Sequence, residues 1–386
     1  MLDFFYNICY IIMVKIRDIV ARGGGLIRKL SKEQKRWYDK RSRKILKQKS
    51  KEKEYRKYKG RREFQQNYNA NKNEIQSIKI GKNEYIFIVP DIFSIRDNPE
   101  ATIQFFNQIL SYRNKHRFGM KFFIDSANVI KVTVDALLYL IAIISDTKYN
   151  STYNYIFAGN LPKSDEAKRV YEESGFMTFV HTKNKIDITP QTNNIKILRG
   201  ENVDSPVAAK VCQFVQDNCG YLRKDTISLY NILVEMMSNT KQHAYKYGFS
   251  SERRAKFWYL YAEEKDNSVS FVFLDTGLGI PTTVRKNWGE RIPFVNKDAD
   301  FIKSALRGDF RTQTLEKNRG KGLPQISESF QSGFLDNIFI FSGKGCCKLS
   351  KSKDDYETID FKNKIFGTLF YWEISKCKEE VEYDNY

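Results

Sequence analysis

Short apolar runs and longer amphipathic runs alternate through the middle of the chain, and this pattern predicts strands and helices in turn. The apolar runs have strand length, whereas the longer runs place apolar residues at helical spacing. We expect a pair of strands at Ile78–Val89, single strands at Met120–Asp125, Asn154–Gly159 and Phe176–Val180, and helices at Pro99–Lys115, Val132–Ser145 and Ser164–Ser174. Such alternation is typical of helices packed on a mixed sheet, so it predicts an α/β domain over residues 74–190.

A second group of elements is expected in residues 200–375. The hydrophobic pattern predicts an amphipathic helix at Ser228–Tyr245, an apolar strand at Val269–Leu274, another apolar helix after residue 322 and a last strand at Leu369–Ile374. The two groups together predict an α/β chain of the two-layer α+β kind.

Positive charge sets the N-terminal residues 1–73 apart from both predicted domains. The chain carries a formal net charge of +19, and residues 15–63 hold 21 Lys and Arg against 6 Asp and Glu. The remainder is therefore close to neutral. We expect residues 1–73 to form a basic arm, helical over Ser31–Glu63 or partly disordered. Two interpretations stay open: a solvated arm, or one that binds nucleic acid or an anionic membrane through residues 15–63.

The termini and the cysteines bear on where the chain resides. Met1–Val14 is apolar but too short to span a bilayer, which leaves a weak peripheral membrane anchor or a true start at Met13. The six cysteines show no CxxC pairing, and a reducing cytoplasm is the expected compartment. Residues 376–386 are expected to be a loose acidic tail.

Polar residues on the helix at Ser228–Tyr245 are the first candidates for chemistry. Glu235, Asn239 and His243 are four residues apart, so they share one helix face within about 12 Å of axial length. An Asn in the middle of a helix is mildly unfavourable, which suggests a compensating role. Taken alone, however, this spacing is more often an exposed polar face.

Glycine turns follow. Asp275 ends the strand at Val269–Leu274, and Gly277, Gly279 and Ile280 come next. A carboxylate at a strand end can accept a hydrogen bond from an exocyclic amine, and glycines let a flat ring approach the backbone.

A second glycine motif, Gly320-Lys321-Gly322-Leu323, runs into the predicted helix after residue 322. Free backbone N–H groups at a helix start favour an anion there. Gly367-Thr368 is expected to open the last strand.

These four motifs, in this order, resemble the nucleotide-binding boxes of the GHKL (Bergerat-fold) superfamily, which includes sensor histidine kinase catalytic domains, anti-sigma-factor serine kinases and gyrase-type ATPases. The resemblance covers about 175 residues and implies an ATP-binding α/β sandwich over residues 200–375. It implies that Asn239 binds Mg²⁺ and that Glu235 is the general base. His243 stands where kinase-like members carry a basic residue, although a packed imidazole at the helix end explains it as well.

The same resemblance implies the remaining contacts with ATP. Asp275 would hold the adenine amine, supported by Thr368. The other implied nucleotide-binding positions are Gly277, Gly279, Ile280, Gly320, Lys321, Gly322 and Leu323. The stretch Thr282–Asn318 would be a mobile ATP lid; a plain surface insertion is the alternative.

The predicted α/β domain over residues 74–190 resembles STAS domains, which occur in anti-sigma-factor antagonists. The resemblance rests on the order of elements, on Phe122-Phe123-Ile124-Asp125 and on Ala158-Gly159-Asn160-Leu161-Pro162. That family carries a phosphoacceptor hydroxyl at the start of its middle helix. Thr133 is the nearest hydroxyl here, but the surrounding residues depart from the family's acceptor pattern.

Three functions follow from these resemblances. The first is an ATP-dependent regulatory switch with ATPase activity, acting on a protein partner or a second copy of the chain. The second is a serine/threonine protein kinase of the anti-sigma type. The third is a non-catalytic ATP-bound module whose basic arm binds nucleic acid or an anionic membrane. A histidine autokinase is disfavoured, because no helical hairpin with an acceptor histidine precedes the ATP domain.

Overall fold

The computed structural model of the chain describes residues 77–81, 83–115, 120–150, 156–180, 193–242, 257–288, 297–309, 322–349 and 356–377. All of these belong to one unit of the chain, Glu63–Tyr386. The predicted basic arm, including the helix at Ser31–Glu63, lies outside the described residues, as does the acidic tail beyond residue 377. We call residues 77–180 the N-terminal region and residues 193–377 the C-terminal region.

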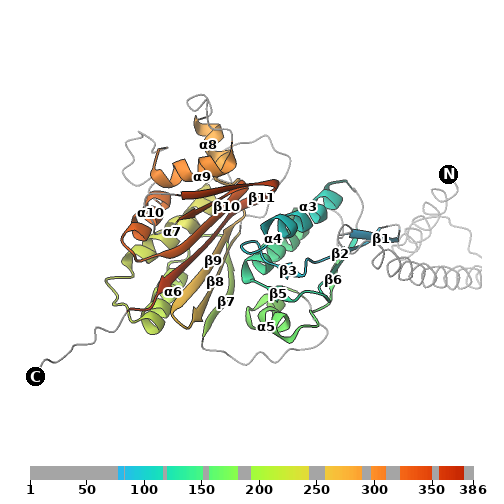
Figure 1. Ribbon diagram of the computed structural model, residues 1–386, viewed down its shortest axis with the longest axis horizontal. Helices are drawn as coiled ribbons and strands as arrows, with labels where there is room; N and C mark the ends of the chain where they lie inside the picture. Colours follow the sequence, from blue (N-terminus) through green and yellow to red (C-terminus); the bar gives the residue numbers. More distant parts are fainter. Residues whose placement is uncertain are drawn as a thin grey trace, which may run out of the picture. The chain divides into compact units, whose positions relative to one another are not determined.

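The N-terminal region contains a four-stranded sheet in the order β1-β2-β4-β6 (Figure 1). Its strands are β1 (Ser77–Gly81), β2 (Glu84–Ile88), β4 (Lys121–Asp125) and β6 (Ile156–Gly159). β1 pairs antiparallel with β2, whereas β2, β4 and β6 are parallel. Two short strands, β3 (Ile92–Phe93) and β5 (Lys131–Val132), pair separately. The strand predictions for residues 78–89, 120–125 and 154–159 are confirmed.

Three helices accompany this sheet: α3 (Pro99–Lys115), α4 (Val134–Asn150) and α5 (Asp165–Glu173). All three were predicted. Helix α4 is apolar on every side, and its residues from Ala136 to Ile143 are almost fully buried. A helix that is apolar all round must be covered on all sides. The sheet of the N-terminal region can cover only part of it.

The strand prediction for Phe176–Val180 is wrong. These residues begin a short 3₁₀ helix, η1 (Phe176–Thr178), because Gly175 has a φ of +85° and turns the chain sharply after α5. The Thr178 hydroxyl donates to the Gly175 carbonyl at 2.8 Å. Phe176 then packs edge-on against Tyr171 of α5, at 5.2 Å between ring centroids. Apolar content alone could not distinguish this turn from a strand.

The C-terminal region is built on a five-stranded antiparallel sheet in the order β10-β11-β9-β8-β7. The strands are β7 (Asn194–Gly200), β8 (Trp258–Lys265), β9 (Ser268–Asp275), β10 (Asp336–Leu349) and β11 (Tyr356–Ser375). Side chains alternate between two buried faces: Trp258 and Leu260 lie in one core, whereas Tyr259 and Tyr261 lie in the other. The mixed α/β class predicted from the sequence is confirmed.

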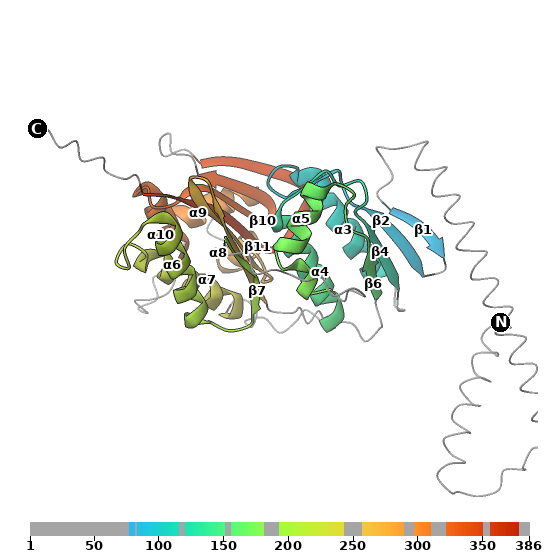
Figure 2. The ribbon, with the colours of Figure 1, turned by 90° about the horizontal axis from the view of Figure 1, so that it is seen from below.

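Different helices cover the two faces of this sheet. One face packs against α6 (Ser205–Cys219), α7 (Ile227–Gln242) and α10 (Gly322–Gln331). The other face shares a core with α3 and α4 of the N-terminal region. These two helices accordingly lie between the two sheets (Figures 1 and 2). This second sheet explains how α4 can be apolar on every side.

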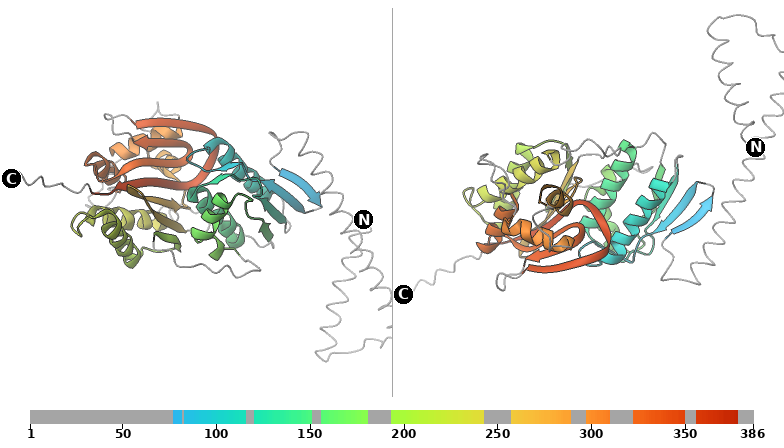
Figure 3. Two further views of the ribbon diagram at one scale, coloured as in Figure 1. Left: turned by 60° about the horizontal axis from the view of Figure 1, so that its bottom comes forward. Right: turned by 90° about the horizontal axis from the view of Figure 1, so that it is seen from above.

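Hydrogen bonds and ring contacts join the two regions along β11. The Tyr139 hydroxyl on α4 accepts the Phe366 N–H at 2.8 Å, and the two rings lie 5.0 Å apart. The Asn107 side chain on α3 donates to the Lys364 carbonyl at 2.7 Å. The long β10–β11 pair bends toward α3 (Figure 3). The two regions therefore form a continuous packed structure.

The segments after β9 differ from expectation in two respects. Strand β11 begins at Tyr356, so Gly367-Thr368 lies inside a long strand and does not open it. The expected lid, Thr282–Asn318, includes most of α8 (Ile280–Trp288) and all of α9 (Asp298–Arg307). Helix α9 has a buried apolar side that includes Phe301, Ile302 and Leu306. This side packs on β10 and β11, so that part of the predicted lid is anchored.

Among the described helices, none is both long enough and apolar enough to cross a membrane.

Candidate functional site

Helix α7 carries the first two candidate residues. Thr226, just before the helix, is buried, and its hydroxyl accepts from the Gln216 side chain on α6 at 2.8 Å. Its carbonyl accepts the N–H of Tyr230 in the first turn of α7 at 3.0 Å. The start of α7 is thereby fixed against α6, and the direction of the helix face that bears Glu235 and Asn239 is fixed with it.

Glu235 and Asn239 are half-buried, one turn apart. Burial raises the pKa of the Glu235 carboxyl. Within the described ranges, neither side chain has a hydrogen-bond or ion-pair partner. Polar groups that are half-buried and have no such partner can take up a ligand without breaking an existing contact. The pair is therefore a candidate ligand site.

Asp275 ends β9 and is the centre of a second group. It pairs in register with Trp258 on one side and Thr368 on the other, so it lies in the middle of the sheet. Its Oδ1 accepts the Gly277 N–H at 2.8 Å. Burial raises the pKa of the carboxyl to about 6, although the Gly277 N–H and the Thr368 hydroxyl partly offset this effect. Asp275 is half-buried, so part of its surface remains open to a ligand.

Close backbone approach explains two of the glycines beside Asp275. Gly367 has a φ of +78°, and a Cβ there would lie 1.9 Å from the Asp275 carbonyl oxygen. Gly279 has a φ of +81°, and its Cβ would lie 2.7 Å from the Ser342 hydroxyl. Contacts within the protein thus already require glycine at both positions. The approach of a ligand, which the sequence suggested for Gly279, is therefore not needed to explain that glycine.

Ser342 is a member of this group that the sequence analysis missed. It is fully buried on β10. Its hydroxyl donates to the Gly367 carbonyl at 2.9 Å, accepts the Ile280 N–H at 3.0 Å, and lies 3.3 Å from the Thr368 hydroxyl. The serine holds the start of α8, the Gly367 turn and Thr368 together. The sequence did contain a signal for this residue, because Ser342 is a single polar residue between the apolar run Ile338–Phe341 and Gly343.

The structure places only part of the second glycine motif. Gly322 begins α10, as predicted, and Leu323 packs against the core on the side of α6 and α7. Helix α10 is also joined to α7, because the Ser228 and Ser329 hydroxyls lie 2.7 Å apart. Gly320 and Lys321 lie outside the described residues, and so does His243.

The candidate residues therefore fall into two groups. Asp275, Thr368 and the turn that contains Gly277, Gly279 and Ile280 are joined through Ser342 and backbone contacts. Glu235 and Asn239 lie on α7, which covers one face of the same sheet. Among the described residues, no hydrogen bond joins the two groups. Together they offer a carboxylate acceptor at a strand end and a carboxylate with an amide on a helix.

The donor set also limits what kind of metal site is possible. The described residues contain no group of three or more His, Cys, Asp or Glu side chains that could hold an ion. Mg²⁺ commonly keeps several waters and binds through one or two protein oxygens together with phosphates. The Asn239 side-chain oxygen fits that kind of coordination, because it has no partner among the described residues.

Thr133 precedes α4 and is half-buried. Its hydroxyl donates to Asp135, which is buried at the start of that helix and also accepts the backbone N–H groups of Ile95 and Arg96, each at 3.3 Å. Thr133 is thus part of a closed hydrogen-bonded group rather than a free hydroxyl.

In comparisons with known proteins, no protein-family model matches the chain, and no curated protein matches it significantly.

Proposed function

We propose that the C-terminal region is a Mg·ATP-binding domain of the GHKL type and that the protein is an ATP-dependent regulatory switch with ATPase activity. One observation carries this proposal. Asp275, a half-buried carboxylate at the end of a central strand, accepts the Gly277 N–H and keeps part of its surface open beside a glycine turn.

The environment of Asp275 suits a ligand that donates hydrogen bonds. The adenine amine is such a donor, and a desolvated carboxylate gains more from a donor than a solvated one does. The Thr368 hydroxyl lies beside the carboxyl and can complete the contact with the ring. Ser342 fixes both Thr368 and the start of α8, which would preorganise this contact.

Glu235 and Asn239 suit the phosphate end of the same ligand. Asn239 would supply an oxygen ligand to Mg²⁺, which neutralises charge on the triphosphate when it is bound. Glu235 would orient and deprotonate the attacking water. Burial raises the pKa of Glu235, which brings a carboxylate closer to the range of an efficient general base.

The contacts along β11 support the switch. Thr368 lies beside Asp275, and two residues earlier the Phe366 N–H bonds to Tyr139 on α4. A change in strand β11 on nucleotide binding would therefore reach α3 and α4 directly. Such coupling requires that the nucleotide bind one arrangement of this strand more tightly than another.

Calorimetry with Mg·ATP tests the proposal. Asp275→Asn keeps the size of the side chain but presents a donor to the adenine amine, so affinity should fall by about a hundredfold. Asp266→Asn, in the exposed turn between β8 and β9, is the matched control and should bind like the parent. Unchanged ATP affinity in Asp275→Asn would refute the nucleotide site.

The serine/threonine kinase remains a second candidate, because Glu235 could deprotonate a protein hydroxyl as readily as water. Incubation with Mg²⁺ and γ-labelled ATP separates the possibilities. Free phosphate indicates the ATPase switch, labelled protein indicates the kinase, and bound but unchanged ATP indicates a non-catalytic module. The hydrogen bond from Thr133 to Asp135 argues against Thr133 as the acceptor.

We further propose a partner, a role for the basic arm and a compartment. A protein partner or a second copy of the chain would receive the signal, and residues 15–63 would contact nucleic acid or an anionic membrane. The cytoplasm is the proposed compartment, because the described cysteines are free thiols and most of them are buried.

A further inference from the structure

A cavity between the two regions has the features of a small-molecule site distinct from the candidate nucleotide site. Its volume is about 280 Å³. It lies between α4 and η1 on one side and the start of β8 and the end of β7 on the other. Its described lining consists of Ile141, Ile144, Ser145, Phe179, Val180, Arg199 and Phe257. Mostly apolar walls with a few polar groups are typical of ligand pockets.

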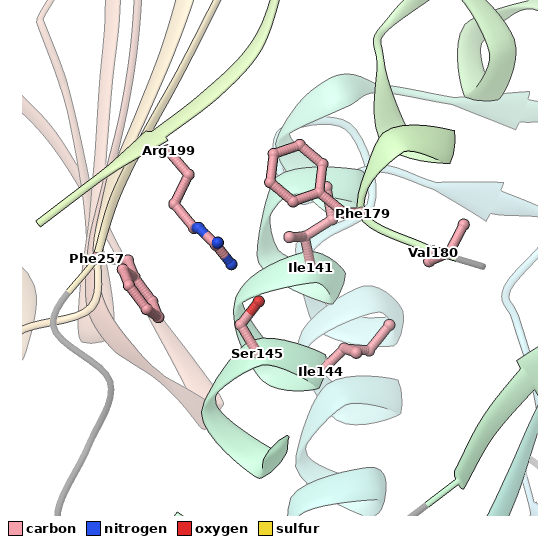
Figure 4. A pocket seen from close by; sticks show the side chains of 7 residues that line it. All are labelled: Ile141, Ile144, Ser145, Phe179, Val180, Arg199 and Phe257. Atoms are coloured by element: carbon pink, nitrogen blue, oxygen red, sulfur yellow. The ribbon is translucent and has the colours of Figure 1, made fainter. Parts of the chain in front are cut away.

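Arg199 is the main polar group of this cavity. It reaches from β7 toward Ser145 on α4, with Phe257 on one side and Phe179 on the other (Figure 4). Its guanidinium lies 4.7 Å from the centroid of the Phe257 ring and 5.6 Å from that of Phe179. Stacking on rings occupies the faces of a guanidinium and leaves its N–H groups available. Within the described ranges, no carboxylate forms an ion pair with Arg199.

A buried hydroxyl beside the cavity is a second, independent sign of a ligand. Tyr259 on β8 is fully buried, and its hydroxyl makes no hydrogen bond of standard geometry. Ser145 and Arg199, which both line the cavity, lie next to this hydroxyl and partly offset the effect of burial, which raises its pKa to about 12. Contacts that fall short of hydrogen-bond geometry leave a buried hydroxyl incompletely satisfied, and a ligand or water can complete it.

The charge of the site limits the ligand further. Arg199 supplies one positive charge, and Asp146, the next residue along α4 after Ser145, is near enough to Tyr259 to raise its pKa. A doubly charged phosphate would be repelled by that carboxylate and would find one cation among the described lining residues. A single carboxylate matches the planar fork of a guanidinium and needs only one positive charge.

We propose that this cavity binds a small monocarboxylate with an apolar body, held by the Arg199 guanidinium and by the Ser145 and Tyr259 hydroxyls. The volume of about 280 Å³ lies just below the usual range for small-molecule pockets, about 300–1,000 Å³, so the body must be small. The apolar part lies against Ile141, Ile144 and the two phenylalanine rings. The site does not depend on ATP binding, and the two proposals can fail separately.

Calorimetry on the full chain with phenylacetate, benzoate and hexanoate tests this site. At least one carboxylate should bind, whereas phenylacetamide, which lacks the charge, and acetate, which lacks the apolar body, should bind much more weakly. Arg199→Gln should lower carboxylate affinity by about 10- to 100-fold, since it removes a charge-assisted pair. Arg223→Gln, at an exposed arginine ahead of α7, is the matched control and should change nothing.

Tyr259→Phe separates binding from folding. It removes only a hydroxyl whose contacts with Ser145 and Arg199 fall short of hydrogen-bond geometry, so the free energy of unfolding should change little while carboxylate affinity falls about fivefold. Three results would overturn the proposal: no binding of any of the carboxylates at millimolar concentration, equal binding of phenylacetate and phenylacetamide, or unchanged affinity in Arg199→Gln.

Discussion

The carboxyl of Asp275 should make the nucleotide-free protein less stable at neutral pH, and Asp275→Asn should relieve that cost. Burial raises the pKa of this group from its ordinary value of 3.8 to about 6 in the folded protein. Folding therefore favours the protonated form. The stability that this group contributes is fully present below about pH 4 and is lost as the pH rises through about 6.

The size of the effect follows from the two pKa values. Each pH unit corresponds to about 1.4 kcal/mol, so the full difference is worth about 3 kcal/mol. Asp275 keeps part of its surface exposed, and solvent screening reduces this figure; we expect about 1 to 3 kcal/mol. Asn cannot ionise, can still accept the Gly277 N–H, and can donate to the Thr368 hydroxyl.

Urea unfolding of parent and variant without nucleotide, at about pH 4 and about pH 7.5, measures this cost. The gain in unfolding free energy from Asp275→Asn should be larger at the higher pH by about 1 to 3 kcal/mol. Other titrating groups cancel, because both proteins contain them. Asp266→Asn should show no such difference. Equal gains at the two pH values would refute the assignment of a desolvated, ionisable carboxyl at this position.

Nucleotide should stabilise the parent more than the variant. A ligand at about a hundred times its Kd adds about 2.7 kcal/mol to the unfolding free energy of the protein that binds it. The parent should gain this amount with Mg·ATP, and Asp275→Asn should gain little. If Asp275 binds ATP, its carboxyl should lower the unfolding free energy of the nucleotide-free protein and raise that of the complex. If its role is purely structural, its effect on the unfolding free energy should not depend on ATP.

Three further predictions concern separate parts of the chain. Gly367→Ala should lower the unfolding free energy by about 3 kcal/mol or more, because the added Cβ would overlap the Asp275 carbonyl. Gly333 has the same φ of +78° but nothing within 4 Å of an added Cβ, so Gly333→Ala should cost only about 1 kcal/mol. Equal costs for the two variants would contradict the close approach at Gly367. Glu235→Gln should lower ATP turnover by about 10² to 10⁴ in rate while Mg·ATP affinity, measured by calorimetry, is kept; Asn239→Ala should weaken Mg·ATP binding itself. The affinity of the full chain for a polyanion should fall by about 10³ between roughly 50 and 200 mM salt. Deletion of residues 1–73 should abolish this binding without changing ATP affinity. Tight binding by the truncated chain would refute the role of the arm.

Local patterns in the sequence predicted most elements of the N-terminal region. Helix α3 has the predicted bounds Pro99–Lys115, and β4 differs from its predicted run by one residue. Both elements are specified by spacing within their own residues, which is why a periodicity reveals them. The strand predicted at Phe176–Val180 was wrong because spacing within that segment does not determine its structure. The positive φ of Gly175 and the packing of Phe176 on Tyr171 determine the turn.

The candidate site was predicted in part. The sequence placed Asp275 at a strand end before a glycine turn and put Glu235 and Asn239 on one helix face, and the structure agrees with both placements. It could not reveal Ser342, whose partners are Gly367, Thr368 and Ile280, because residues 25 and 62 positions away are brought together only by sheet pairing.

What the sequence determined by itself is the position and the apolar or polar character of the elements with a clear pattern, such as α3, α4, β4 and β9. The nearly continuous apolar run Val269–Leu274 is typical of a strand whose two faces are both buried. It does not say what buries them. Only the tertiary structure decided that α3 and α4 cover the second face and that Tyr139 meets Phe366. Likewise, only the tertiary structure stacks Arg199 between Phe179 and Phe257. These contacts join residues that are far apart along the chain, and they depend on complementary shape and charge between different elements. The spacing of residues within one element therefore cannot predict contacts between elements.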